Sequence, residues 1–384
     1  MFDRDFIIVN GKIVLPHGIL QRGSIQVEEG RIVKVTEEGI RLKRRSLDAR
    51  GRYIMPGMID LHSDAIEKEI EPRPNSRFPI DIALFELDKK FSACGITTAF
   101  HAISYAGDEL GIRSNQIATE TIKKLNQMRK KFGIRTKAHA RFEITDREAI
   151  PYLEEIIEAG CIDLFSIMDH TPGQGQFKEV AFFKNYYGTV YQKTDAELEK
   201  IIERKKEKAK AMRGHLQYIL NLCLSKNLRL VSHDDDSQEK VAWLSQMGVS
   251  ISEFPVNLEA ARAASERGIH ICLGSPNALR GESQSKNLSA REAISLGYGN
   301  ILCSDYSPMS MLHAVFTLWR VGILSLHEAV NLVSLHPAQA VGLDHEVGSI
   351  AEGKEADLVW VEMEDEIPRV RKAFVSGREV YSSC

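Results

Sequence analysis

The segment MPGMIDLHSD, Met55 to Asp64, decides the fold of this chain. A Pro-Gly turn leads into a short apolar run that ends in His62, Ser63 and Asp64. Side chains two positions apart on a strand point to the same side, so His62 and Asp64 are presented together. Two ligating side chains at one strand end predict a metal site there, with further ligands on other strands.

Strand-like and helix-like segments alternate after this point. The strand candidates are MIDLHSD (58–64), GITTAFHAIS (95–104), RTKAHARFEI (135–144), DLFSIMDH (163–170), LRLVSHDD (228–235), VSISEFPVN (249–257), IHICLGSPN (269–277) and NILCSDY (300–306). Eight units over roughly 280 residues fit an α/β fold of the (β/α)8 TIM-barrel type. A doubly wound sheet is the competing architecture, but no Gly-rich fingerprint follows the first strand.

The two ends of the chain resemble each other in pattern. Short strands joined by Gly-containing turns are expected in residues 6–16, 23–35, 44–57, 347–362 and 369–381. Such strands bury little surface alone, so both ends are expected to pair into one small β-sandwich. The predicted domains are a discontinuous β-sandwich at 1–55 and 345–384, and a metal-dependent hydrolase barrel at 56–344.

The composition excludes several classes of function. The chain has 384 residues, 43% of them hydrophobic and 27% charged, with a formal net charge of −3. This balance gives no reason to expect a nucleic acid or a membrane as partner. The charged N-terminus lacks the apolar core of a signal peptide, and the six scattered cysteines indicate reduced thiols, so a cytoplasmic location is expected.

Polar residues able to bind metal collect at the predicted strand ends. On the third strand, Lys137, His139, Arg141 and Glu143 share the face that should point into the barrel, because the other face is apolar. Glu143 is the uppermost of the four. The predicted metal ligands, each near the end of a strand, are His62, Asp64, Glu143, His170, His233 and Asp305. His101, His139 and Asp169 are held in reserve.

Six ligands exceed the three or four of a lone catalytic zinc and predict two divalent ions per chain, Zn, Mn or Fe. Glu143 has two oxygens and is the expected bridge between them. Asp305 is the expected catalytic residue, which ligates one ion and accepts the proton of the attacking water. A metal-bound water with a pKa about 7 would supply hydroxide for hydrolysis.

Taken together, these residues resemble the amidohydrolase superfamily over essentially the whole chain. The resemblance rests on PGMIDLH, the later strand-end histidines, the Asp of the last strand, SLHPAQAVGL and GSIAEGKEADLVW. It implies a metal-bearing (β/α)8 barrel beside a β-sandwich made from both termini, which agrees with the interpretation of the strands.

A closer resemblance is to the phosphonate-metabolism diphosphatases of the carbon–phosphorus lyase pathway. It rests on HSDAIEKEIEPRP, the run from HDDD through SEFPVNLEAARAA, GSPNALRGESQSKNLSA and SDYSPMSML. That family carries His-x-Asp on the first strand, and its activity is hydrolysis of α-D-ribose 1-methylphosphonate 5-triphosphate to the 5-phosphate and pyrophosphate. The chain departs from the family pattern at Ala65, Glu69, Leu87, His101, Gln284 and Lys286.

A triphosphate requires cationic side chains around it. The substrate-binding candidates are Lys68, Arg73, Arg141 and Arg280, with Lys286 as a further cation. The departures leave a second hydrolase function open, on a cyclic amide or an N-acyl group. A non-catalytic barrel that serves as an assembly partner is disfavoured because all six ligands are present. A small phosphorylated molecule is the expected partner, and a homodimer stays open.

Overall fold

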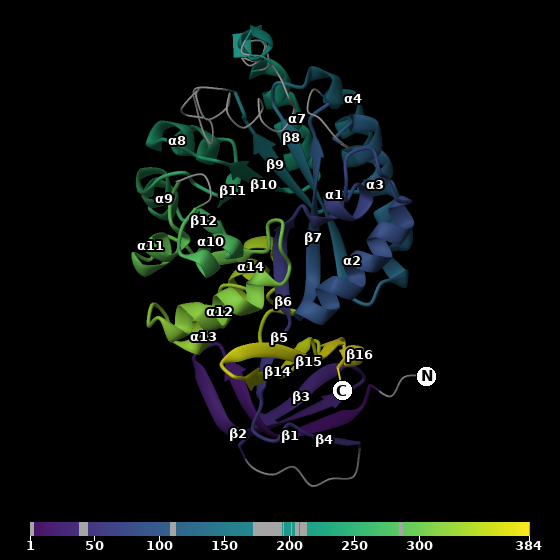
Figure 1. The fold of residues 1–384 in the computed structure, drawn as a ribbon, viewed down its shortest axis with the longest axis vertical. Helices are drawn as coiled ribbons and strands as arrows, with labels where there is room; N and C mark the ends of the chain where they lie inside the picture. Colours follow the sequence, from purple (N-terminus) through teal and green to yellow (C-terminus); the bar gives the residue numbers. More distant parts are fainter. Residues whose placement is uncertain are drawn as a thin grey trace.

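The computed structural model describes residues 4–37, 45–107, 113–171, 194, 196–200, 202–203, 207, 213–283 and 287–383. It consists of a barrel of eight parallel strands and a mainly antiparallel sheet that adjoins one end of the barrel (Figure 1). Both parts were expected from the sequence pattern.

The eight barrel strands pair in chain order, each parallel to the next. They are β6 (Met58–Ser63), β7 (Ile96–Tyr105), β8 (Arg135–Glu143), β9 (Leu164–Met168), β10 (Arg229–His233), β11 (Val249–Glu253), β12 (His270–Gly274) and β13 (Ile301–Cys303). The first and last strands meet where Asp305 N donates to His62 O at 2.9 Å and Asp64 N donates to Asp305 O at 3.0 Å. All eight predicted strands are therefore confirmed, and the predicted order is correct.

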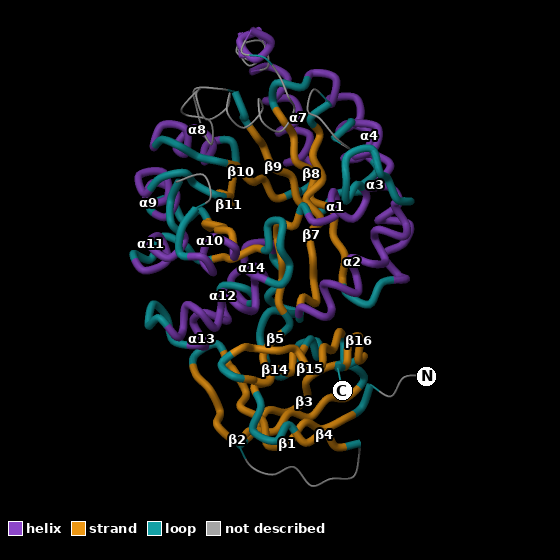
Figure 2. Tube along the Cα trace, viewed as in Figure 1, coloured by secondary structure: helices purple, strands orange, loops and turns teal. Residues whose placement is uncertain are grey.

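Helices cover the outside of the barrel (Figure 2). Those within the described residues are α1 (Ala65–Ile70), α2 (Ile80–Cys94), α3 (Asn115–Met128), α4 (Ile150–Glu158), α7 (Arg213–Ser225), α8 (Gln238–Gln246), α9 (Leu258–Ser265), α10 (Ser275–Arg280), α11 (Ala290–Ser295), α12 (Ser310–Arg320), α13 (Leu326–Asn331) and α14 (Leu335–Val341), with 3-10 turns Arg129–Lys131 and Arg147–Ala149. Local sequence sets their ends. Ser114 caps α3 and Asn257 caps α9, each by accepting a hydrogen bond from the backbone N–H three residues on.

The lower interior of the barrel is apolar. Phe100, Leu164, Val231 and Ile251 belong to one buried cluster that also includes Ile301. The strand pairing places Leu164 beside His139, on the inner face of the barrel. Because side chains on a strand alternate, Ser166, His233 and Glu253, each two positions further along its strand, also face inward, nearer the mouth.

The terminal sheet has the strand order β16-β15-β14-β5-β1-β2-β3, with β4 paired to β1. Its ring contact between Phe6 and Phe374, with centroids 5.1 Å apart, joins strands that two others separate in the sheet. The sheet therefore curves around its own apolar core. Its strands are β1 (Phe6–Leu15), β2 (Gly18–Glu28), β3 (Arg31–Thr36), β4 (Ser46–Asp48), β5 (Tyr53–Pro56), β14 (Leu358–Glu364), β15 (Ile367–Val375) and β16 (Arg378–Ser382).

The terminal sheet meets the barrel at the amino ends of the barrel strands. β5 runs directly into β6, and Arg135, the first residue of β8, forms ion pairs with Glu355 and Asp357 beside β14. The carboxyl ends of the barrel strands therefore form the opposite, open end of the molecule. In the described part of the chain, none of the helices has the length and apolar character needed to cross a membrane.

His101 lies on the outer face of β7, away from the barrel interior. Its ring centroid is 5.5 Å from that of Phe91 on α2. It is buried, and neither ring nitrogen has a hydrogen-bond partner among the described residues. Burial lowers the pKa of His101 to about 3. This histidine is a packing residue of the α2–β7 contact and not a reserve ligand.

Replacing His101 by leucine should reduce the acid sensitivity of folding. The pKa of His101 in the folded chain lies below its value of 6.5 in the unfolded chain. Below pH 6.5 the unfolded chain therefore binds a proton that the folded chain does not, so stability that is complete above pH 6.5 is lost as pH falls toward 3. Between pH 7.5 and 5, His101 should cost the wild type about 2 kcal/mol of unfolding free energy, and the variant should lack that loss. Urea unfolding at both pH values measures it; identical pH dependence in the two proteins would refute the assignment.

Candidate metal centre

Two groups of buried ligating side chains lie inside the barrel near its open end. The first ligand group is His62 of β6, His139 of β8 and Glu253 of β11. The second ligand group is His170, His233 and Asp234, at the ends of β9 and β10. Within each group, one ligand atom per residue lies within 4.8 Å of the others. Six residues from five strands are thus gathered in two places.

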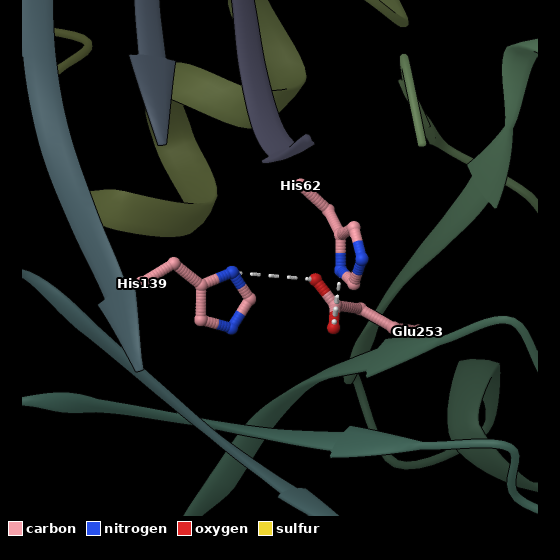
Figure 3. A group of neighbouring side chains, drawn as sticks. All are labelled: His62, His139 and Glu253. Carbon is pink, nitrogen blue, oxygen red and sulfur yellow. Dashed lines mark ion pairs between the residues drawn. The ribbon is translucent and has the colours of Figure 1, made fainter. Parts of the chain in front are cut away.

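In the first ligand group, both imidazoles turn toward the Glu253 carboxylate (Figure 3). His62 Nδ1 is 3.0 Å from Glu253 Oε2, and His139 Nδ1 is 4.0 Å from Glu253 Oε1. The His139 ring is oriented from below by the Leu61 carbonyl oxygen, 3.0 Å from its Nδ1. If Nδ1 donates to that oxygen, Nε2 carries the lone pair. This buried Nε2 atom has no hydrogen bond among the described residues.

In the second ligand group, Asp234 lies between two imidazoles. Its Oδ2 is 2.9 Å from His233 Nδ1 and 3.6 Å from His170 Nε2. Glu143 joins the group from β8, with its Oε2 2.9 Å from His170 Nδ1. The backbone N–H of His170 and the hydroxyl of Thr145 both donate to the Glu143 carboxylate, at 3.3 and 2.9 Å, and hold it in place.

The spacing of these atoms fits bound cations. His62 Nδ1, both Glu253 oxygens, His233 Nδ1 and Asp234 Oδ2 are buried without a hydrogen bond in the described structure, although ring nitrogens and oxygens lie about 3 Å apart. Ligands of one tetrahedral ion at about 2.0–2.1 Å lie roughly 3.3 Å from each other. The nitrogen–oxygen distances in both groups therefore match the spacing of ligand atoms around a divalent metal.

Burial sets the charge state of these ligands. It lowers the pKa of His62 well below its usual value, assisted by the Arg141 charge, and lowers the pKa of His139 to about 3. It raises the pKa of Glu253, an effect that the nearby His139 opposes. His62 and His139 are therefore neutral, which is the form that binds metal, and a cation would offset the cost of burying the Glu253 carboxylate.

Asp64 and Asp305 lie at the seam between β6 and β13. Their backbones are hydrogen-bonded to each other, with Asp64 N 3.0 Å from Asp305 O. Burial, then the negative charge of Asp64, raises the pKa of Asp305 well above its usual value. A carboxyl group in this setting has a high affinity for a proton and is suited to accept one.

Among the predicted substrate-binding cations that the structure describes, Arg141 alone is inside the barrel. Its Nη2 is 3.2 Å from His233 Nε2, and its Nη1 donates to Ser104 Oγ at 3.3 Å. Lys68 and Arg73 are exposed, on α1 and in the loop after it. Arg280 is exposed at the end of α10, where it donates to Tyr306 OH at 3.1 Å. Lys286 lies outside the described residues.

A family comparison agrees with this geometry. The model of the amidohydrolase family matches residues 106–380. The chain belongs to the amidohydrolase family. It is an enzyme, a metal-dependent hydrolase, and the two ligand groups occupy the mouth of its barrel.

This amidohydrolase is similar to several characterised proteins. It is 33% identical to the α-D-ribose 1-methylphosphonate 5-triphosphate diphosphatase of Escherichia coli (strain K12), over 98% of this chain and all of that one. It is 21% identical to the imidazolonepropionase of Thermoplasma volcanium, over 94% of this chain and 91% of that one. The solved structure of a Xaa-Pro dipeptidase with bound methionine has the same fold, with TM-score 0.67 and 13% identity over 99% of this chain and all of that one.

The ligands predicted from the sequence lie in and beside the two ligand groups of this amidohydrolase. Among the predicted ligands, His62 lies in the first group, and Glu143, His170 and His233 lie in or beside the second. Asp64 and Asp305 lie at the neighbouring seam. Glu253 and Asp234 were missed, and His139 was only held in reserve. The sequence marks Glu253 and Asp234 as residues near strand ends and His139 as inward-facing, but it does not show which partners they meet.

Proposed function

We propose that this enzyme hydrolyses α-D-ribose 1-methylphosphonate 5-triphosphate to the 5-phosphate and pyrophosphate. The observation that carries the proposal is the 33% identity, over essentially full length, to a diphosphatase that bears this substrate in its name. The His-x-Asp of β6 and the SEFP and SDY segments of the resemblance all lie at the barrel mouth.

Three of the six departures from the diphosphatase pattern are compatible with the same substrate, because they lie away from the ligand groups. Glu69 forms an ion pair with Lys90 of α2. Leu87 is buried within α2, and His101 packs against the same helix. These three changes therefore concern the packing of α1, α2 and β7. Ala65, which follows Asp64, borders the centre; Gln284 and Lys286 lie outside the described residues.

The proposed cofactors are two divalent ions, Zn, Mn or Fe. His62, His139 and Glu253 would hold one ion, and His170, His233 and Asp234 with Glu143 would hold the other. Asp64 and Asp305 would complete the ligand set from the β6–β13 seam. Bound divalent metals lower the pKa of water and neutralise phosphate charge, which is the chemistry they supply here.

The protein's own groups would perform the remaining steps. Asp305 accepts the proton that the attacking water loses when its oxygen bonds to phosphorus. The phosphoanhydride bond breaks, and pyrophosphate leaves with the bonding electrons. Arg141, buried and positively charged beside His233, stabilises the negative charge of the phosphates. Lys68, Arg73 and Arg280 would contact the outer phosphates from the rim.

A comparison of substrates tests this function. The enzyme is expected to release pyrophosphate from the ribose methylphosphonate triphosphate with kcat/KM at least about 10⁴ M⁻¹s⁻¹, a value ordinary for an enzyme on its own substrate. Dihydroorotate, hydantoin and N-acyl amino acids should be turned over at least 100-fold less efficiently. If the cyclic amides or N-acyl amino acids were the better substrates, the proposed function would change from diphosphatase to cyclic amide or N-acyl hydrolase.

A further inference from the structure

Phe254 has an unusual backbone conformation directly after β11. Its φ is +52°, in the left-handed region, which bulky side chains rarely adopt. Its N–H donates to Cys272 O at 2.9 Å, so the backbone is fixed to the next barrel strand. Such strain persists only where the surrounding structure imposes it, and it concentrates at functional sites.

The conformation changes where the ring points. On a regular strand, the residue after the inward-facing Glu253 would face outward, toward the helices. The left-handed turn brings the Phe254 ring back over the barrel interior. The ring lies against Gly274 of β12, where an added Cβ atom would be in ordinary van der Waals contact with it, 3.6 Å from Phe254 Cε1.

In this position, the ring contacts one histidine of each ligand group. Its centroid is 5.0 Å from that of His62, with the planes at 78°, and 5.1 Å from that of His233, at 70°. Both are edge-to-face contacts, which are favoured between aromatic rings. The centroids of the two imidazoles are themselves 5.6 Å apart, so one phenyl ring is in contact with both.

We propose that Phe254 is a positioning residue that fixes the His62 and His233 rings and thereby couples the geometry of the two metal sites. The proposal rests on the two-ion centre of the proposed function and deepens it. Phe254 carries no ligand atom and acts only through the rings it contacts. Outer contacts of this kind typically change metal affinity by 10- to 100-fold.

Metal titration of a Phe254→Leu variant tests the proposal without substrate. Zinc dissociation constants, measured for purified protein against a competing chelator dye, should be raised about 10- to 100-fold for both ions, with two ions still bound at saturation. Phe254→Tyr, which keeps the aromatic ring, should restore the constants to within a few-fold of wild type.

Phe316→Leu is the matched control. Phe316 is a buried aromatic residue of α12 whose edge contacts are with Tyr53 of β5 and Trp319 of α12, neither of which belongs to a ligand group. It should lower the melting temperature without changing zinc affinity. Wild-type constants in Phe254→Leu, or an equal change in Phe316→Leu, would overturn the role of Phe254. A wild type that binds a single ion would overturn the two-ion centre itself.

Discussion

Replacing Asp305 by asparagine is expected to lower kcat for pyrophosphate release by about 10²- to 10⁴-fold, the usual contribution of a positioned proton acceptor. Asparagine has nearly the same shape and keeps an oxygen, so metal content and KM should change little. Its amide cannot accept the proton from water. The raised pKa of Asp305, caused by burial and by Asp64, suits this residue to the role. Steady-state kinetics with metal analysis of the same samples measures both effects.

The matched control for this experiment is Asp365→Asn. Asp365 is an exposed residue of the turn between β14 and β15, in the terminal sheet. The same change of charge there should leave kcat unchanged. If Asp305→Asn kept kcat within a few-fold of wild type, proton transfer would have to be assigned to another group.

Replacing Glu143 by alanine is expected to remove one of the two ions and nearly all activity. The carboxylate is 2.9 Å from His170 Nδ1 and also accepts the His170 backbone N–H at 3.3 Å. Alanine would remove a proposed ligand and would also release the imidazole that the carboxylate orients, and each loss weakens metal binding. Elemental analysis after dialysis should give about one ion per chain.

Glu148→Ala provides the comparison for Glu143. Glu148 is exposed and lies five residues further along the chain, in the 3-10 turn Arg147–Ala149. Its loss should leave both metal content and activity at the wild-type level. If the Glu143→Ala protein kept both metal ions, the Glu143 carboxylate would not be a ligand of the ion in the second ligand group.

The sequence was sufficient to predict the barrel because eight strand-like segments alternate with helix-like segments over roughly 280 residues. The alternation on β8 also predicted correctly that His139, Arg141 and Glu143 face inward. The same rule fails at Asp234, which alternation would turn away from His233. Its φ of +52° brings the carboxylate back to the imidazole, and φ values of +52° and +55° affect Phe254 and Asp305 in the same way. A local rule that assumes extended backbone cannot anticipate these turns.

Glu253 was missed for a different physical reason. Its partners His62 and His139 come from β6 and β8, which lie on the other side of the barrel from β11 in strand order. Which residues meet across a barrel depends on the tilt and stagger of the strands. These are properties of the closed sheet, so no single strand reveals them. The positions of Lys68, Arg73 and Arg280 on the exposed rim were likewise beyond the reach of a strand-end rule.

The central claim is that the buried ligand groups hold the ions on which hydrolysis depends. It is tested most directly by returning metal to chelator-stripped enzyme while pyrophosphate release from the ribose methylphosphonate triphosphate is followed. Activity should be absent from the stripped protein and should rise with added Zn²⁺, Mn²⁺ or Fe²⁺ to a plateau at about two ions per chain. Full activity in the metal-free protein would contradict the account.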